Sequence, residues 1–85
     1  MSSVKITKEQ IAALLAKSKV EDTKLGEKST VVSVTLPNGF VIITSSSCVD
    51  PANYDHELGK SVCMRRAEDK LWELEGYRLQ SSLNQ

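Results

Sequence analysis

Apolar residues recur at helical spacing near the start of the chain, in the segment ITKEQIAALLAKSK. Thr7 and Gln10 have the spacing of a capping box, and Ile6 falls where a hydrophobic staple would meet Ile11. These signals predict a helix over residues 8–18. The apolar stripe of that helix consists of Ile11, Leu14 and Leu15. Core packing is the ordinary role of such a stripe, and we favour it over a partner-binding role.

The next segment, residues 20–28, is polar, carries charges of both signs and is interrupted by Gly26. This composition predicts a connecting loop rather than a regular element. A loop of this kind can close over a ligand, but most such segments only join two elements.

Two β-branched runs surround Pro-Asn-Gly in STVVSVTLPNGFVIITS, which predicts a β-hairpin over residues 29–45. Asn38 and Gly39 alone would suit a two-residue type I′ loop, whereas a preceding Pro37 suits a type I turn with a G1 bulge. The two loops differ by one residue of register, which turns every side chain of one strand to the other face. We predict the bulged loop, because it collects large apolar side chains of both strands on one face. Those side chains are Val32, Val34, Leu36, Phe40 and Ile42.

The opposite face of the predicted hairpin is also partly apolar, since it carries Val31, Val41 and Ile43. A two-stranded ribbon is not stable alone in water. One face is therefore expected to meet the helices, and the other face or an open edge to meet a second copy of the chain.

The segment that follows has helical periodicity and predicts a long helix over residues 51–75, closed by Gly76 as its C′ residue. Asp50, before a first-turn proline, can cap this helix, and Asn53 or Asp55 can begin it later. Apolar side chains lie on two sides of the helix at 100° per residue. One side has Cys63, Met64, Ala67, Leu71 and Leu74, and the other has Tyr54, Leu58, Val62 and Trp72.

A helix with two apolar faces must be covered twice, and a neighbouring subunit is the expected second cover. Gly59 lowers the helix propensity, which indicates that another backbone or a ligand comes close at that point.

Together these elements predict one α+β domain over residues 1–85, in the order helix, β-hairpin, long helix, with a tail over residues 80–85. A chain this short buries a smaller fraction of its surface than a larger one, so its own core is marginal. We therefore expect a homo-oligomer that completes the fold.

Hydrophobic residues make up 40% of the chain and charged residues 26%, which is typical of a folded domain. Eleven basic and eleven acidic residues cancel, so no net charge draws the chain to nucleic acid or to a membrane, and we expect neither partner. The start of the chain lacks the apolar core of a signal peptide, and the longest apolar run, residues 40–43, is too short to span a bilayer. These features predict a cytoplasmic protein.

The chemistry-bearing side chains Cys48, Asp50, Asp55, His56 and Cys63 do not form a recognisable catalytic or metal-binding motif. Both cysteines are expected to be reduced thiols, and without paired CxxC or HxxxH spacing no metal site is expected. A nucleophile pair of Cys48 and His56 would require contact between them and a third group to orient the base. We therefore predict no catalytic residue, no cofactor and no enzymatic activity.

Three serines, Ser45 to Ser47, precede the start of the long helix. Hydroxyls and unpaired helix N–H groups together can bind a phosphate or carboxylate, and Lys60 and Arg65 further along the helix could supply positive charge. Tyr54 would offer a flat surface for stacking. The candidate ligand-binding residues are Ser45, Ser46, Ser47, Asp50, Asn53, Tyr54, His56, Lys60 and Arg65. The competing interpretation is that this segment only caps the helix and packs Tyr54.

The segment CVDPANYDHELGK, followed by AEDKLWELEGYRL, resembles the signature half of a family of small tailed-phage proteins. That family is typified by the gene 49 product of phage N4 and the gene 66 product of phage Sf6. The resemblance extends from the hairpin through Leu79, and Cys48-Val49-Asp50-Pro51, Leu58-Gly59 and Leu71-Trp72 are among its most specific pieces. It implies a phage setting and carries over no active site.

Small phage proteins outside the virion and replication modules are often directed at a host component, commonly a defence factor. The resemblance therefore favours a non-enzymatic binding protein acting in the host cytoplasm. Its most concrete form is an oligomeric sponge that sequesters a small anionic, nucleotide-type immune signal. The alternative is a protein–protein inhibitor of a host defence or regulatory protein that uses an exposed apolar face. An enzyme built on Cys48 and His56 is the third hypothesis, and the missing catalytic constellation counts against it.

Overall fold

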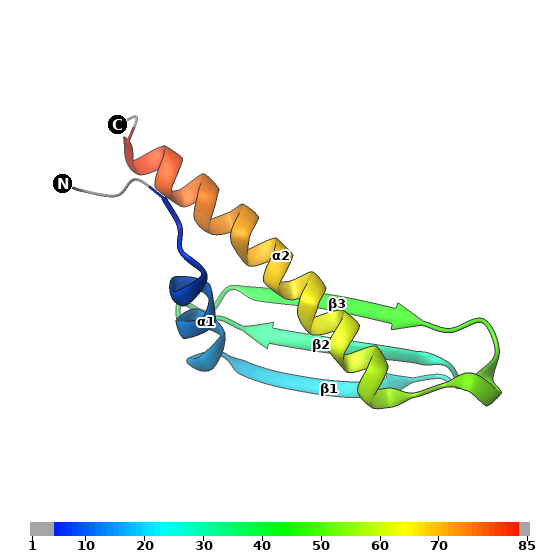
Figure 1. Cartoon of the computed structure of the whole chain (residues 1–85). Helices are drawn as coiled ribbons and strands as arrows, with labels where there is room; N and C mark the ends of the chain where they lie inside the picture. The colour runs from blue at the N-terminus through cyan, green and yellow to red at the C-terminus, as the bar shows by residue number, and fades with distance from the viewer. Residues whose placement is uncertain (1–4, 84–85) are drawn as a thin grey trace.

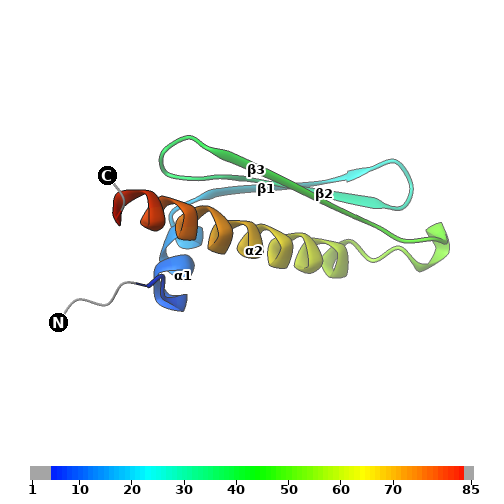
Figure 2. The same cartoon turned by 90° about the horizontal axis from the view of Figure 1, so that it is seen from above.

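A long helix lies across one face of a three-stranded antiparallel sheet, and a short helix flanks it (Figure 1). The computed structural model describes residues 5–83. The elements are α1 (Lys8–Ala16), β1 (Lys19–Leu25), β2 (Ser29–Thr35), β3 (Val41–Ser47), the 3-10 helix η1 (Pro51–Asn53) and α2 (His56–Leu83). Seen from above, both helices lie on the same side of the sheet (Figure 2). The predicted α+β class is confirmed, but the hairpin is part of a larger sheet.

The predicted loop over residues 20–28 is wrong, because most of it forms the edge strand β1. This strand pairs with β2 along its whole length, from Lys19 opposite Thr35 to Leu25 opposite Ser29. Almost all of its side chains are exposed, so the strand carries no apolar alternation that sequence patterns could detect. Its order comes from pairing with β2, and Gly26, with φ of 70°, makes the turn between them.

The turn between β2 and β3 has the predicted bulged form. The Gly39 N–H donates to the Leu36 carbonyl at 2.8 Å, and the Leu36 N–H donates to the Phe40 carbonyl at 2.8 Å. Gly39 has φ of 93°, the left-handed conformation that a G1 bulge requires. The predicted register is confirmed, since Val34 lies opposite Ile42.

The core lies between the sheet and α2. Its buried apolar residues are Ile11, Val32, Val34, Leu36, Ile42, Cys63, Ala67 and Leu71. Phe40, from the predicted apolar face, is 51% exposed at the tip of the hairpin. Gly59 allows α2 to approach β2, because a Cβ added there would lie 2.5 Å from the Thr30 Oγ1 atom. The close neighbour that Gly59 predicted is therefore a strand of the same chain.

Helix α1 begins as predicted and ends early. Thr7 and Gln10 form the capping box, in which each side chain bonds the backbone N–H of the other residue. The helix ends at Ala16, and the side chain of Ser18 donates to the Leu14 carbonyl at 2.7 Å beyond it. A side chain bonded to the last turn in this way helps to end the helix before residue 18.

The long helix differs from the predicted 51–75 at both ends. Asp50 caps only η1, by accepting from the Ala52 N–H at 3.0 Å, and Asp55 accepts from the Leu58 N–H at 3.2 Å where α2 begins. Gly76 does not end the helix, because it lacks the positive φ of a C′ glycine. The helix continues to Leu83. Residues 80–83, which were predicted to belong to a tail over residues 80–85, are therefore helical.

The C-terminal half of α2 extends past the β3 edge of the sheet (Figure 1). The molecule is correspondingly elongated, with extents of 54 × 20 × 20 Å. Within residues 5–83, neither helix is long and apolar enough to cross a membrane.

Candidate functional site

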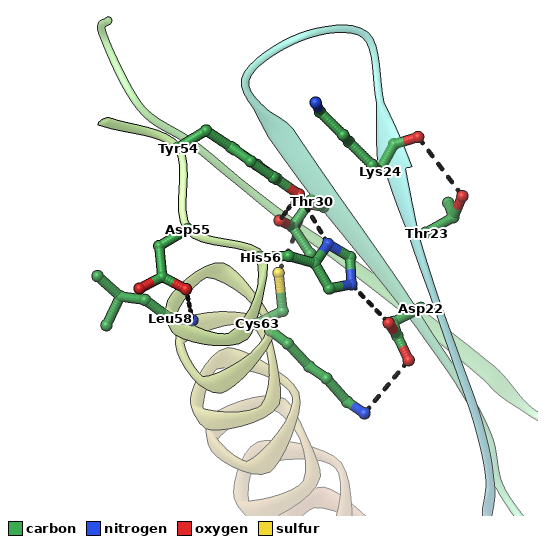
Figure 3. A network of polar contacts seen from close by, with 10 residues as sticks. Asp22, Thr23, Lys24, Thr30, Tyr54, Asp55, His56, Leu58 and Cys63 are labelled. Atoms are coloured by element: carbon green, nitrogen blue, oxygen red, sulfur yellow. Dashed lines mark hydrogen bonds and ion pairs between the residues drawn. The ribbon is translucent and has the colours of Figure 1, made fainter. Parts of the chain in front are cut away.

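A chain of hydrogen bonds joins β1, β2 and the start of α2 (Figure 3). The distances are 2.6 Å from Asp22 Oδ2 to His56 Nε2, 2.7 Å from His56 Nδ1 to the Tyr54 hydroxyl, and 2.7 Å from that hydroxyl to Thr30 Oγ1. Asp22 also pairs through Oδ1 with Lys60 Nζ at 3.2 Å. Three elements, β1, β2 and the start of α2, are therefore held together by five side chains.

The network has a single consistent set of donors when His56 is neutral. Thr30, which is fully buried, donates to the Tyr54 oxygen, Tyr54 donates to His56 Nδ1, and Nε2–H donates to the Asp22 carboxylate. The hydrogen bond from His56, followed by that from Lys60, holds the pKa of Asp22 below its ordinary value. Every polar atom of the network is thereby satisfied, which favours one fixed arrangement.

The Tyr54 side chain is held at both its hydroxyl and its ring. Its hydroxyl is held by Thr30 and His56, and the Lys24 ammonium lies 4.8 Å from the centre of its ring. A cation at this distance from an aromatic ring is attracted to the ring face. Tyr54 is therefore a preorganised aromatic wall, because both its polar end and its ring are held in place.

A cavity of about 150 Å³ lies beside Tyr54, between the end of β3 and the start of α2. Its lining residues are Lys28, Thr30, Ser46, Ser47, Cys48, Asn53, Tyr54, Asp55, Leu58, Gly59 and Val62. Lys28 spans one side, where its Nζ donates to the Val49 carbonyl at 3.2 Å. Ser46, Ser47 and Tyr54, which the sequence singled out, therefore do meet at one hollow.

Both nearby aspartates are engaged with helix N-termini. The Asp50 carboxylate accepts from the Ala52 N–H, and the Asp55 carboxylate accepts from the Leu58 N–H. Of the two, only Asp55 lines the cavity. Its charge is partly compensated by the backbone N–H groups of the first turn of α2.

The other predicted site residues lie away from the cavity. Ser45 is exposed, His56 belongs to the hydrogen-bond network, and Lys60 pairs with Asp22. Arg65 lines a shallow groove beside Leu15 of α1. Lys60 and Arg65 therefore do not line the cavity at the joint, because the turn of the helix carries them toward β1 and α1.

Asp22, Thr30 and Lys28 also belong to this region, although the sequence pattern did not single them out. Asp22 and Lys28 lay in the predicted loop, where nothing marked them. Thr30 did carry a signal, because it shares the period-two face of Val32 and Val34 and was therefore due to be buried. A buried hydroxyl needs a partner, which here is Tyr54.

The two cysteines face different groups. The Cys63 thiol is buried and lies 3.6 Å from the Thr30 carbonyl, while the Cys48 thiol donates to the Asp50 carbonyl at 3.3 Å. Both ring nitrogens of His56 are occupied by Tyr54 and Asp22. Cys48 and His56 therefore do not form a nucleophile–base pair in this structure.

The sequence model of the phage protein (N4 Gp49/phage Sf6 gene 66) family matches residues 6–83. No curated protein and no solved structure gives a significant match. The matched range contains the whole hydrogen-bond network and every residue that lines the cavity.

Proposed function

Because the chain belongs to the phage protein (N4 Gp49/phage Sf6 gene 66) family, we propose that it is a non-enzymatic protein that sequesters a small anionic, nucleotide-type signal of host defence. It would do so in the cytoplasm of the host, as a homo-oligomer. The observation that carries this proposal is the cavity walled by Tyr54, whose ring is already oriented before any ligand arrives.

The lining of the cavity suits the two chemical parts of a nucleotide. The hydroxyls of Ser46 and Ser47 and the ammonium of Lys28 can donate hydrogen bonds to phosphate oxygens. Tyr54 offers an aromatic wall against which a base or a sugar can pack. Lys24, which lies over the Tyr54 ring, adds a second positive charge at the same end of the sheet.

The size of the cavity limits what it can hold. Pockets for drug-sized ligands enclose roughly 300–1,000 Å³, whereas this cavity is about 150 Å³. One phosphate or one sugar fits such a space, and a whole nucleotide does not. The remainder of the ligand would lie against a neighbouring subunit, which is the arrangement expected of a sponge built from small chains.

Binding is a better proposal than catalysis because the reactive groups nearby are already engaged. Both nitrogens of His56 have hydrogen-bond partners, and the Cys48 thiol faces a backbone carbonyl. A general base needs an atom that is free to accept the proton and lies within hydrogen-bond distance of it.

Isothermal titration calorimetry with a panel of mononucleotides, cyclic mono-, di- and trinucleotides and inorganic phosphate tests the proposal. The variant with Lys28→Ala and Ser46→Ala should bind the best nucleotide at least tenfold more weakly, since it loses two phosphate donors. Arg65→Ala is the matched control, because it removes a cation on the other side of α2 and should leave the affinity unchanged. The proposal fails if no panel member binds or if the double variant binds like the wild type.

A second candidate function, inhibition of a host protein, is favoured by the apolar side chains on the outer side of α2. Leu58 is 63% exposed, Trp72 37% and Leu83 52%, and helical spacing places them on a common side. Trp72→Arg should then abolish phage fitness on a host that carries the targeted defence. The variant with Lys28→Ala and Ser46→Ala should leave that fitness unchanged, which is the reverse of the outcome expected for a sponge.

A further inference from the structure

The two edges of the sheet differ sharply in charge. The edge strand β1 carries Lys19, Glu21, Asp22 and Lys24 among its seven residues, whereas β3, with the sequence VIITSSS, carries no charge and no proline. Strand pairing runs through β3 without a bulge. Charges, prolines and bulges are the usual devices that prevent an edge from pairing with another strand, and β3 has none of them.

The backbone groups on the free side of β3 follow from the hydrogen bonds at its two ends. Leu36 N–H donates to the Phe40 carbonyl, and Cys48 N–H donates to the Lys28 carbonyl. Bonded and non-bonded pairs alternate in an antiparallel ladder, so every second residue between them points its N–H and C=O away from β2. These residues are Val41, Ile43, Ser45 and Ser47. Within residues 5–83, only the Ser45 carbonyl among these groups has an observed partner, the guanidinium of Arg66.

The flank of α2 that meets this edge has an ordered arrangement of charges. Arg66 reaches the free side of β3, and residues three, four and seven positions later share its side of the helix. These residues are Asp69, Lys70 and Glu73, and all are exposed. Arg66, at the N-terminal end of this flank, is basic, and Glu73, at its C-terminal end, is acidic. The two ends of the flank therefore carry opposite charges.

We propose that a second copy of this chain docks on the β3 edge about a two-fold axis perpendicular to the sheet. The two β3 strands then pair antiparallel and make one continuous sheet across both copies. The same rotation sets the two α2 helices antiparallel on one face, where their C-terminal halves pass the edge (Figure 1). Arg66 of each copy then approaches Glu73 of the other, and the uncharged strands bring no like charges together.

A copy of the same chain fits this edge better than an unrelated strand. The charge order of the α2 flank complements itself only in an antiparallel arrangement, which is the arrangement that antiparallel β3 pairing imposes. Docking of the second copy does not require a ligand, since Ile43 and Arg66 lie outside the cavity.

Two measurements on the full chain without nucleotide test the docking. One is light scattering coupled to size-exclusion chromatography, and the other is amide hydrogen exchange. The expected mass is an even multiple of the 9.4 kDa chain, with slow exchange at the Ile43 amide. Ile43→Pro removes a backbone N–H that does not bond to β2, and its ring blocks the free edge of β3. The variant should therefore assemble at least tenfold more weakly, while its circular dichroism spectrum should match that of the wild type. Ile43→Lys serves as a second edge variant with the same expected result, should the proline variant fail to fold.

Charge reversal on α2 distinguishes this interface from any other. Arg66→Glu and Glu73→Arg should each weaken assembly, and the double variant should restore it, because the exchanged charges again attract across the interface. The two residues are seven positions apart in one helix and do not pair there, so the rescue cannot come from within one chain. A monomer at 100 μM wild-type chain, assembly that survives both edge variants, or a double variant no better than the singles would overturn the docking. None of these measurements uses nucleotide, so a wrong interface and a cavity that does not bind are told apart. Only the monomer result also bears on the sponge, because the proposed function needs a neighbouring subunit.

Discussion

The two halves of α2 belong to one helix but are held in different ways. Residues 56–71 lie on the sheet and bury Cys63, Ala67 and Leu71, whereas no side chain of residues 72–83 is buried. The first half is tied to β1 through Asp22, while the second half has local pairs such as Arg78 with Glu75. Tertiary packing therefore stabilises the first half. In the second half Leu74 still packs against the core, and beyond it helix propensity and local pairing are the main stabilising contributions. Substitutions in the two halves should follow different physical rules.

The largest contrast is expected between two leucines. Leu71 is 1% exposed in the core, so Leu71→Ala should lower the free energy of unfolding by about 2–5 kcal/mol through lost burial and a cavity. Leu83→Ala, in the exposed half, should change it by less than about 0.5 kcal/mol. Urea unfolding followed by circular dichroism measures both. Equal losses would mean that the second half is also buried, as in an assembly that covers it.

The two glycines of α2 should respond with opposite signs, and Gly59→Ala has the larger effect. Its new Cβ would lie 2.5 Å from Thr30 Oγ1 and 3.0 Å from Thr30 Cβ, and Thr30 is fully buried and bonded to Tyr54. The overpacking should destabilise the fold by about 1–3 kcal/mol, despite the better helix propensity of alanine. Adding Thr30→Ala should recover part of this loss, because one of the two close contacts disappears. Additive losses in the double variant would refute the close approach.

Gly76→Ala should instead stabilise the protein by about 0.5–1 kcal/mol, since alanine is the better helix former. A Cβ at Gly76 would meet nothing within 4 Å, and the residue has no positive φ. A higher melting temperature in thermal unfolding would agree with this expectation. A lower one would show that another backbone packs against this part of α2, as a second copy could.

Local signals in the sequence predicted local structure well. Pro37 to Gly39 specified the turn and register of β2 and β3, and Thr7 with Gln10 specified the start of α1, because each depends on neighbours within a few residues. Gly59 correctly indicated a close approach. Gly76 misled because a helical glycine and a C′ glycine look alike in sequence and differ only in φ.

The features that sequence patterns did not reveal depend on distant partners. Strand β1 buries almost nothing and is ordered by β2, so its own residues gave no strand signal. The hydrogen bond between His56 and Asp22 joins residues 34 positions apart. For the candidate site, the sequence located Ser46, Ser47, Asn53 and Tyr54 at one joint, but the basic residue that lines it, Lys28, comes from another turn.

The smallest effect is expected at the tie between β1 and the first turn of α2. Hydrogen bonds from His56 and Lys60 lower the pKa of Asp22 below the ordinary value of an aspartate. The stabilisation from the ionised carboxylate is therefore fully present above the unfolded pKa and is lost as the pH falls through the lower, folded pKa. Asp22→Asn should be slightly less stable than the wild type at pH 7, and the two should converge as the pH falls below about 4.

Urea unfolding from pH 7 down to pH 3 measures this convergence, and amide exchange locates it. In Asp22→Asn, the amides of the first turns of α2 should exchange faster, whereas those of residues 72–83 should not change, because only the first half is tied to β1. Glu75→Gln is the matched control, since it removes a carboxylate whose partner, Arg78, lies on the same helix. Faster exchange along the whole of α2 in Asp22→Asn would mean that the helix opens as one unit, and the distinction between its halves would then be wrong.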